Sequence, residues 1–288
     1  MKRCVCTIAR SAVFGIVILS LLVLSSLAGS TRAHAASPPP NMGKLAAVAY
    51  LGHAASGSAQ LNWSSAHDVL TVTLYVSGLQ AKTVHVAHIH AGNCKVNGAI
   101  IYPLNDVVAN AAGNAASTTV IRNVKGGIPA TGWYIDVHVG ASLATPEQAA
   151  ALACGTIMNS NSASGVQSVV TTLGVTPSPN QNTYGDSLLT LKGETLTVYT
   201  TVYHLVPGSM HMEHIHAGSC QYQVPGDVLY PLTELVANAN GVATASTTIT
   251  GITAIPVSGW YVNIHYGTDL STQVGYDPID CGNVNVVY

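Results

Sequence analysis

Charged side chains are scarce in this sequence. Asp, Glu, Lys and Arg make up 8% of the 288 residues, and aromatic residues make up 6%. Four of the ten basic residues (Lys2, Arg3, Arg10 and Arg32) lie near the N-terminus, and their removal would leave a net charge near −6. This balance argues against nucleic acid or an anionic membrane surface as the main partner. A small molecule or a metal ion is the kind of ligand that remains.

Long apolar runs are lacking except for one near the N-terminus. It extends from Ala12 to Ala28, follows the basic residues and precedes the small residues of Ala33-His34-Ala35. This arrangement is typical of a secretory signal peptide, so we predict that residues 1–36 are removed by cleavage near Ala35 or Ala36. An uncleaved N-terminal anchor is the alternative. No later run is long enough to span a membrane, and we expect a secreted, extracellular protein without membrane contact after cleavage.

Segments with a helical pattern are also rare. Thr, Ser, Val, Ala, Gly and Asn are abundant, which favours strands joined by turns. Every second residue is apolar in stretches such as 71–76 and 195–199, a pattern that predicts half-buried strands. Turn pairs such as Ser77-Gly78 and Asn240-Gly241 separate the strands at the spacing of sandwiches and barrels. Only residues 145–153 indicate a helix, of a turn or two, so we predict an all-β protein.

A pattern of four histidines closed by two cysteines occurs twice. The first copy holds His85, His88, His90, Cys94, His138 and Cys154, and the second holds His211, His214, His216, Cys220, His265 and Cys281. The offset between the copies stays between 126 and 128 residues, and a polar segment at 159–165 separates them. We therefore predict two tandem domains, at residues 43–158 and 165–288, each of ordinary size for one core.

The spacing of the histidines predicts a metal site in each copy. Residues two apart on a strand point to the same face, so His88 and His90 present two imidazoles side by side, as do His214 and His216. The third ligand would come from His138 in the first copy and His265 in the second. Three neutral imidazoles suit copper or zinc far better than calcium or magnesium.

Other residues of the pattern are expected to support these sites. His85 and His211 lie three residues before the histidine pair, a spacing that turns them away from the ligands and towards the backbone. Tyr134 and Tyr261 share the histidine face and are expected to line the sites. Trp133 and Trp260 alternate with apolar residues on the opposite face, which predicts core packing.

Four cysteines would remain after signal cleavage, and they allow three pairings. The repeat favours Cys94 with Cys154 and Cys220 with Cys281, because each copy then closes on itself. A loop of about sixty residues closed in this way is stabilised by about 4 kcal/mol in the chain-entropy model. Free thiols or cysteine metal ligands are the alternative for a protein outside an oxidising compartment.

The repeated pattern resembles copper,zinc superoxide dismutase. The matching segments are His-x-x-His-x-His followed by Gly and Cys, a late Val-His strand, and the stretch from Leu152 to Ile157. The resemblance implies an eight-stranded Greek-key barrel. It also implies copper at both sets of three histidines, a supporting role for His85 and His211, and the two cysteine pairs given above.

The same segments also resemble the chordin (CHRD) domain. Its hallmark is His-Ile-His-x-Gly followed by Tyr-Val-Asn-x-His, and Tyr261-Val262-Asn263-Ile264-His265 fits that wording closely. This resemblance implies a relative of the dismutase barrel. It also implies an alternative function, a non-enzymatic extracellular binding or structural module that needs no metal.

Several dismutase features are missing. No histidine lies between His90 and His138, where dismutases hold zinc and the bridging ligand, so a zinc subsite is not expected. The arginine that guides superoxide in that family is replaced by Ala151 and Pro278. We therefore expect a secreted copper-binding protein and leave open whether it has copper-only, dismutase-like activity. A two-domain cupin fits less well, because cupins usually place a glutamate a few residues after the histidine pair and the stretch from Ala91 to Gly98 contains none.

Overall fold

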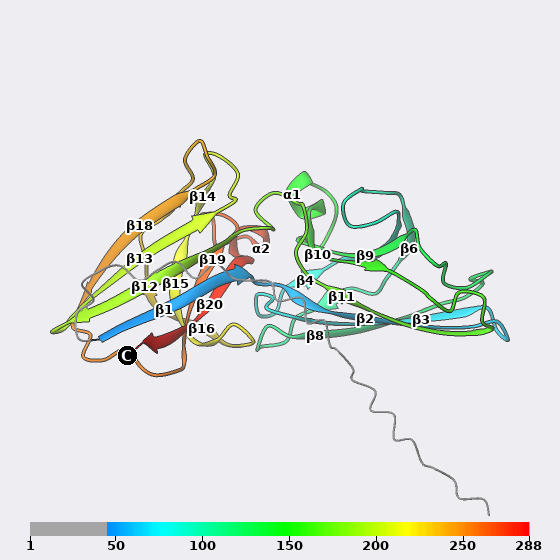
Figure 1. Cartoon of the computed structure of the whole chain (residues 1–288), viewed down its shortest axis with the longest axis horizontal. Coiled ribbons are helices and arrows are strands. Elements are labelled where there is room, and N and C mark those ends of the chain that lie inside the picture. Colours follow the sequence, from blue (N-terminus) through cyan, green and yellow to red (C-terminus); the bar gives the residue numbers. More distant parts are fainter. Residues whose placement is uncertain (1–44, 288) are drawn as a thin grey trace, which may run out of the picture. The chain divides into compact units, whose positions relative to one another are not determined.

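The computed structural model describes residues 45–287. Strands dominate it, and the two helices of the described residues are single turns, α1 (Pro146–Ala149) and α2 (Gln273–Tyr276) (Figure 1). The all-β class is therefore confirmed, as is a short helix within 145–153. No helix in this part of the chain is long and apolar enough to cross a membrane. The predicted signal peptide at residues 1–36 lies outside the described residues.

Two four-stranded sheets enclose a first apolar core, which includes Leu61, Val72, Ile89 and Ile135. One sheet has the order β11 (Val166–Leu173), β2 (Ser56–Ser64), β3 (Val69–Ser77) and β8 (Ala115–Ile121). The other has the order β10 (Ala151–Ile157), β9 (Trp133–His138), β5 (Ala87–Ala91) and β6 (Ile100–Pro103). Strands β4 (Val84–His85) and β7 (Val107–Val108) form a separate two-stranded sheet.

A single eight-stranded sheet surrounds the second core, which includes Leu189, Val198, Ile215 and Val262. Its order is β16 (Tyr222–Pro231), β15 (Glu213–Ser219), β19 (Trp260–His265), β20 (Pro278–Val287), β1 (Leu45–His53), β12 (Tyr184–Lys192), β13 (Thr195–Tyr203) and β18 (Ala243–Thr250). A further pair joins β14 (Met210–His211) to β17 (Leu235–Val236). The pairing is that of an open, half-barrel sheet, so the structure does not confirm two closed barrels.

The strands follow the alternation of the sequence. In β3 the side chains of Leu70, Val72, Leu74 and Val76 are buried, while the residues between them are half-buried or exposed. Strand β9 differs, because five of its six residues are buried. One of its faces packs into the first core and the other carries His138, so this strand is covered on both sides.

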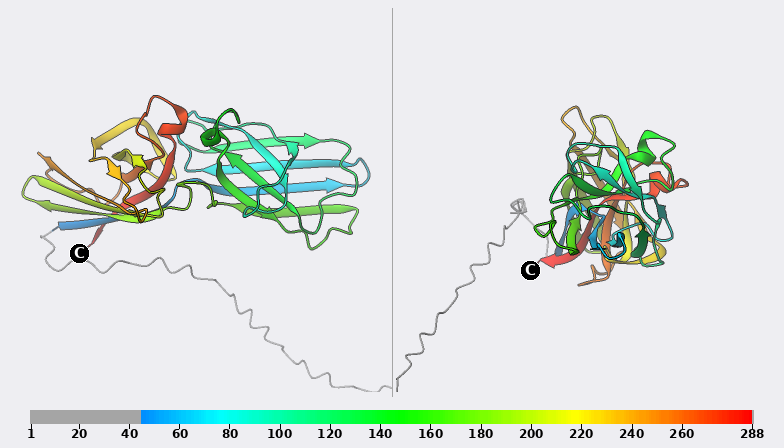
Figure 2. Two further views of the ribbon diagram at one scale, coloured as in Figure 1. Left: turned by 90° about the horizontal axis from the view of Figure 1, so that it is seen from above. Right: turned by 90° about the vertical axis from the view of Figure 1, so that its right-hand side faces the viewer.

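The first strand of the described chain joins the second core. Strand β1 pairs with β12, with Leu45 opposite Leu191, and with β20, with His53 opposite Asp280 (Figure 2). Conversely, β11 pairs along its whole length with β2 and contributes to the first core. Strand β1 thus joins the second core although it precedes every strand of the first core in the chain. Strand β11 joins the first core although it follows the predicted junction at residues 159–165. The predicted domain limits at residues 43–158 and 165–288 stay a prediction.

Two disulfides close the turns that follow the histidine pairs. They join Cys94 to Cys154 and Cys220 to Cys281, and both were predicted from the sequence. Gly92 and Gly218 precede the first cysteine of each pair with φ of +108° and +105°, a backbone region that disfavours side chains with a Cβ. Gly92 directly follows the last residue of β5, and Gly218 lies within the last two residues of β15.

Candidate metal centres

Three histidines of the first pattern lie together on one face of β5 and β9. His88 and His90 point to the same side of β5, and His138 comes from the end of β9. Their ligand atoms all lie within 4.8 Å of one another, and the ring centroids are 5.1 to 5.6 Å apart. We call these three residues the first histidine cluster.

The second histidine cluster has nearly the same geometry. It consists of His214 and His216 of β15 and His265 of β19, with ring centroids 5.1 to 5.8 Å apart. All three side chains are buried, whereas His88 of the first cluster is half-buried. The structure thus brings together both sets of residues predicted as metal ligands. Their role as ligands stays a prediction.

Backbone carbonyls fix the orientation of several rings. The Nδ1 atom of His138 donates a hydrogen bond to Ala149 O at 2.8 Å, and that of His265 donates to Tyr276 O at 2.6 Å. His90 Nδ1 donates in the same way to Gly98 O at 3.0 Å. Because a carbonyl only accepts, each of these Nδ1 atoms carries the proton and each Nε2 keeps its lone pair. Nε2 is therefore the atom available to a metal ion.

Several of these lone pairs are buried without a protein partner. The Nε2 atoms of His90, His138 and His216 and the Nδ1 atom of His88 make no hydrogen bond within the described structure. An unpartnered buried polar atom costs about 1 to 3 kcal/mol. A metal ion at the centre of either cluster would satisfy these atoms, so the donor set fits a cation that accepts imidazole ligands.

Burial favours the neutral form of five predicted ligand imidazoles. It lowers the pKa of His138 and His216 to about 4 and that of His265 to about 3. The pKa of His88 and of His214 is lowered as well, mainly by burial. A neutral imidazole is the form that binds metal, so these five rings are in the ligand form at neutral pH.

His85 and His211 lie behind the clusters and contact the backbone of the third histidine. His85 Nδ1 donates to His138 O at 3.0 Å, and His211 Nδ1 donates to His265 O at 2.9 Å. The Nε2 atom of His85 lies 2.7 Å from Thr83 Oγ1 and is held by it. Both side chains are fully buried, and both face away from the ligand side.

The tyrosines and tryptophans of β9 and β19 occupy opposite faces. Tyr134 stacks on His90 with ring centroids 5.0 Å apart, and Tyr261 stacks on His216 at 5.1 Å. Trp133 packs against the first core and Trp260 against the second. The tyrosines therefore lie at the clusters, and the tryptophans do not.

Sequence reasoning missed three residues near the clusters. Asp136 lies opposite His88 on the adjoining strand, and Asn263 lies opposite His214. Both are buried and have side-chain atoms without hydrogen-bond partners. Tyr276 stacks on His265 with ring centroids 4.9 Å apart. The two-residue period of β9 already placed Asp136 on the histidine face, but nothing local indicated Tyr276.

The buried carboxyl group of Asp280 makes the stability of the metal-free protein depend on pH. Burial raises the pKa of Asp280 to about 7, whereas an unfolded chain ionises this side chain at about 4. Its favourable contribution to folding is therefore present at low pH and is lost as the pH rises from about 4 to about 7. The loss corresponds to about 4 kcal/mol.

Replacing this group tests that cost. We expect the stability of Asp280→Asn, measured relative to the native protein by urea denaturation, to rise by about 4 kcal/mol between pH 4 and pH 8. The pH dependence is the readout, because any fixed packing cost of the amide cancels in it. A difference that stays constant with pH would contradict the raised pKa.

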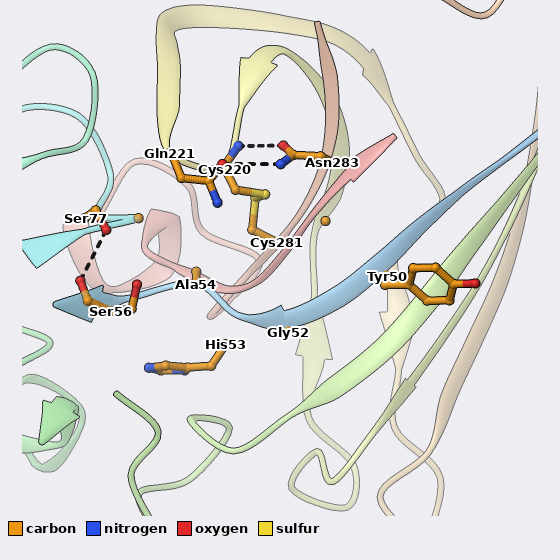
Figure 3. A pocket seen from close by; sticks show the side chains of 12 residues that line it. Tyr50, Gly52, His53, Ala54, Ser56, Ser77, Cys220, Gln221, Cys281 and Asn283 are labelled. Carbon is orange, nitrogen blue, oxygen red and sulfur yellow. Dashed lines mark hydrogen bonds between the residues drawn. A yellow bond between two sulfur atoms is a disulfide. The ribbon is translucent and has the colours of Figure 1, made fainter. Parts of the chain in front are cut away.

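A separate pocket of about 270 Å³ adjoins the second disulfide (Figure 3). Its lining includes His53, Cys281 and Asn283, and no residue of either histidine cluster. Asn283 accepts a hydrogen bond from Cys220 N at 2.9 Å and donates one to Gln221 Oε1. His53 Nε2 donates to Leu152 O at 2.9 Å. These contacts hold the walls of the pocket, and the pocket does not open onto a candidate metal centre.

Comparison with known proteins places part of this chain in a family. No curated protein matches the chain. The likeness to copper,zinc superoxide dismutase therefore rests on the sequence motifs alone and stays a prediction. The matching family model is that of the CHRD domain, and the matched segment contains β1 and all three residues of the first histidine cluster. Residues 32–147 of this chain are a CHRD domain.

Proposed function

We propose that this chain is a secreted copper-binding protein with two CHRD-like modules, each holding one copper ion through its histidine cluster. The observation that carries the proposal is the convergence of three imidazoles in each cluster, with ligand atoms within 4.8 Å of one another. Imidazole nitrogen suits copper, zinc and other late first-row metals. Three such ligands complete a site for Cu(I), while Cu(II) would need water or a further group.

The state of the rings supports this proposal. The lone pairs of His138 and His216 are buried and unpartnered, and burial holds the pKa of both rings at about 4. Surface histidines do not combine these properties. A bound copper ion would supply one-electron redox chemistry, and the residues around it would exclude water and fix the ligand geometry.

The proposed function has consequences for the type of barrel and for the location of the protein. We infer that the sheets are variants of the dismutase-like barrel in which each module keeps the copper half of the site and lacks the zinc half. Disulfides and CHRD domains are typical of extracellular proteins, and both are present here. Export through the predicted signal peptide at residues 1–36 fits these features.

A second function is a structural or binding module that needs no metal. One contact favours it: His265 Nε2 lies 3.0 Å from His214 Nδ1, a hydrogen bond that pairs two rings of the second cluster with each other. This bond satisfies one ring nitrogen of each of two histidines without an ion, while His216 Nε2 has no partner. The corresponding rings of the first cluster make no such bond among the described residues. The first cluster therefore supports the metal-free module less than the second cluster does.

The experiment is to produce the chain with its own N-terminal segment in a secreting host and to purify it from the medium. We expect an N-terminus at Ala36 or Ser37 and two copper ions per chain after loading. His88→Ala and His214→Ala should each remove one ion. Absence of stoichiometric copper would overturn the metal proposal and leave the structural module. Copper binding without consumption of superoxide would identify a binding protein rather than an enzyme.

A further inference from the structure

The two histidine clusters differ in what covers them. In each, the Nδ1 atom of the third histidine donates to the carbonyl of the last residue of a one-turn helix, Ala149 in α1 and Tyr276 in α2. The two positions are thus equivalent in the structure. At one of them the side chain is a methyl group, and at the other it is a large aromatic ring.

The ring of Tyr276 covers the second cluster. It lies nearly parallel to His265, with an interplanar angle of 16° and ring centroids 4.9 Å apart. His265 is fully buried beneath it, and His214 and His216 are 5% and 4% exposed. Entry to the second cluster from this side requires the tyrosine to move.

A cavity lies at the corresponding place beside the first cluster. It has a volume of about 440 Å³, and its lining includes Tyr134, Asp136, Ala149 and Ala150. Two of these residues contact the cluster, since Tyr134 stacks on His90 and Ala149 O accepts from His138. The histidines themselves are not part of the lining. The carboxyl group of Asp136 is buried in this wall without a hydrogen-bond partner for Oδ1. His88 is only half-buried on the same cluster.

We propose that the two clusters have different access to solvent and small molecules. The first cluster is open at the half-buried His88 and has only the methyl group of Ala149 at the position from which the ring of Tyr276 covers the second cluster. The first is then the centre at which an ion or a small molecule exchanges, and the second retains its ion. Asp136 lies opposite His88 in the first cluster, at the cross-strand position that the neutral Asn263 occupies opposite His214 in the second.

Chemical modification of the metal-free protein tests this difference without any metal. Diethyl pyrocarbonate acylates accessible neutral imidazoles, and peptide mass spectrometry follows each histidine. We expect the half-buried His88 to react about tenfold faster than its counterpart His214, which is 5% exposed, since burial protects a group from reagents. Tyr276→Ala should raise the rate of His265 by about the same factor. Equal rates in the native protein, or no change in Tyr276→Ala, would overturn the proposal.

Two further variants complete the test. Ala149→Tyr should slow the modification of His138. Tyr50→Ala, which removes an exposed tyrosine of β1, should leave all modification rates unchanged. A general effect of Tyr50→Ala would show that the rates report loosening of the fold, and would count against the proposal.

Metal release is the second readout, and it alone rests on the proposed function. Removal of Cu(I) by excess bathocuproine disulfonate should be biphasic, with one fast and one slow ion, and Tyr276→Ala should make the slow phase faster. A single phase from both centres would contradict unequal access. A protein that binds no copper would defeat the metal proposal, while the modification rates would still decide the question of access.

Discussion

Ala49→Lys should destabilise the second core and leave the first core intact. Ala49 lies in β1, is fully buried and packs in the second core, although it comes before every strand of the first core in the chain. A lysine there buries a charge without a partner, which costs about 3 to 5 kcal/mol. Hydrogen exchange followed by mass spectrometry should show lost protection in β12 and β20, the two neighbours of β1.

The control is the adjacent residue on the other face of the same strand. Tyr50 is 51% exposed and lies opposite Asp186, so Tyr50→Lys should change the stability of either core little. Lost protection in β2 and β3 after Ala49→Lys would contradict the observed pairing. That result would mean that β1 completes the first core, at the edge of β2 that β11 occupies here.

His85→Leu and His88→Leu should have opposite effects on the metal-free protein. His85 is fully buried and both of its ring nitrogens have partners, His138 O and Thr83 Oγ1. Leucine would remove the donor to His138 O and leave Thr83 Oγ1 with Gln80 O alone, at a cost of about 1 to 3 kcal/mol. His88 has a buried Nδ1 atom without a partner, so its replacement by leucine removes an unfavourable group. Its stability should be unchanged or slightly higher.

Urea denaturation together with copper titration separates these two roles. His88→Leu should lose the copper ion of the first cluster and keep the native free energy of unfolding. His85→Leu should lower the free energy of unfolding, and it should weaken copper binding through the displaced carbonyl of His138. His211→Leu should repeat the loss of stability at the second cluster, where His211 contacts His265 O. A stable His85→Leu variant would show that these hydrogen bonds do not hold the site together.

Much of the site follows from the sequence because it depends on short-range geometry. The two-residue period of a strand places His88 and His90 on one face, and the same period separates Tyr134 from Trp133. The cysteine pairs follow from the repeated pattern, and the all-β class follows from the alternation of apolar residues. These features need only local spacing and the assumption that equal segments fold alike.

The rest depends on contacts that local spacing does not encode. Strands β1 and β11 are both alternating segments, and nothing within either shows which sheet edge it will join. Tyr276 lies eleven residues after His265, beyond a loop and a one-turn helix, so its stacking is a tertiary contact. Two tandem Greek-key barrel or sandwich domains were expected from the resemblance. The structure confirms the all-β class, and the pairing gives an open, half-barrel sheet around the second core.

The most direct test of the central claim is a crystal structure of the copper-loaded protein with anomalous data collected at the copper absorption edge. We predict two anomalous peaks per chain, each bounded by the three ring nitrogens of one histidine cluster at about 2 Å. Peaks only at other positions, or clusters that keep the His265 to His214 hydrogen bond with no peak at either centre, would contradict the claim that these histidines form metal sites.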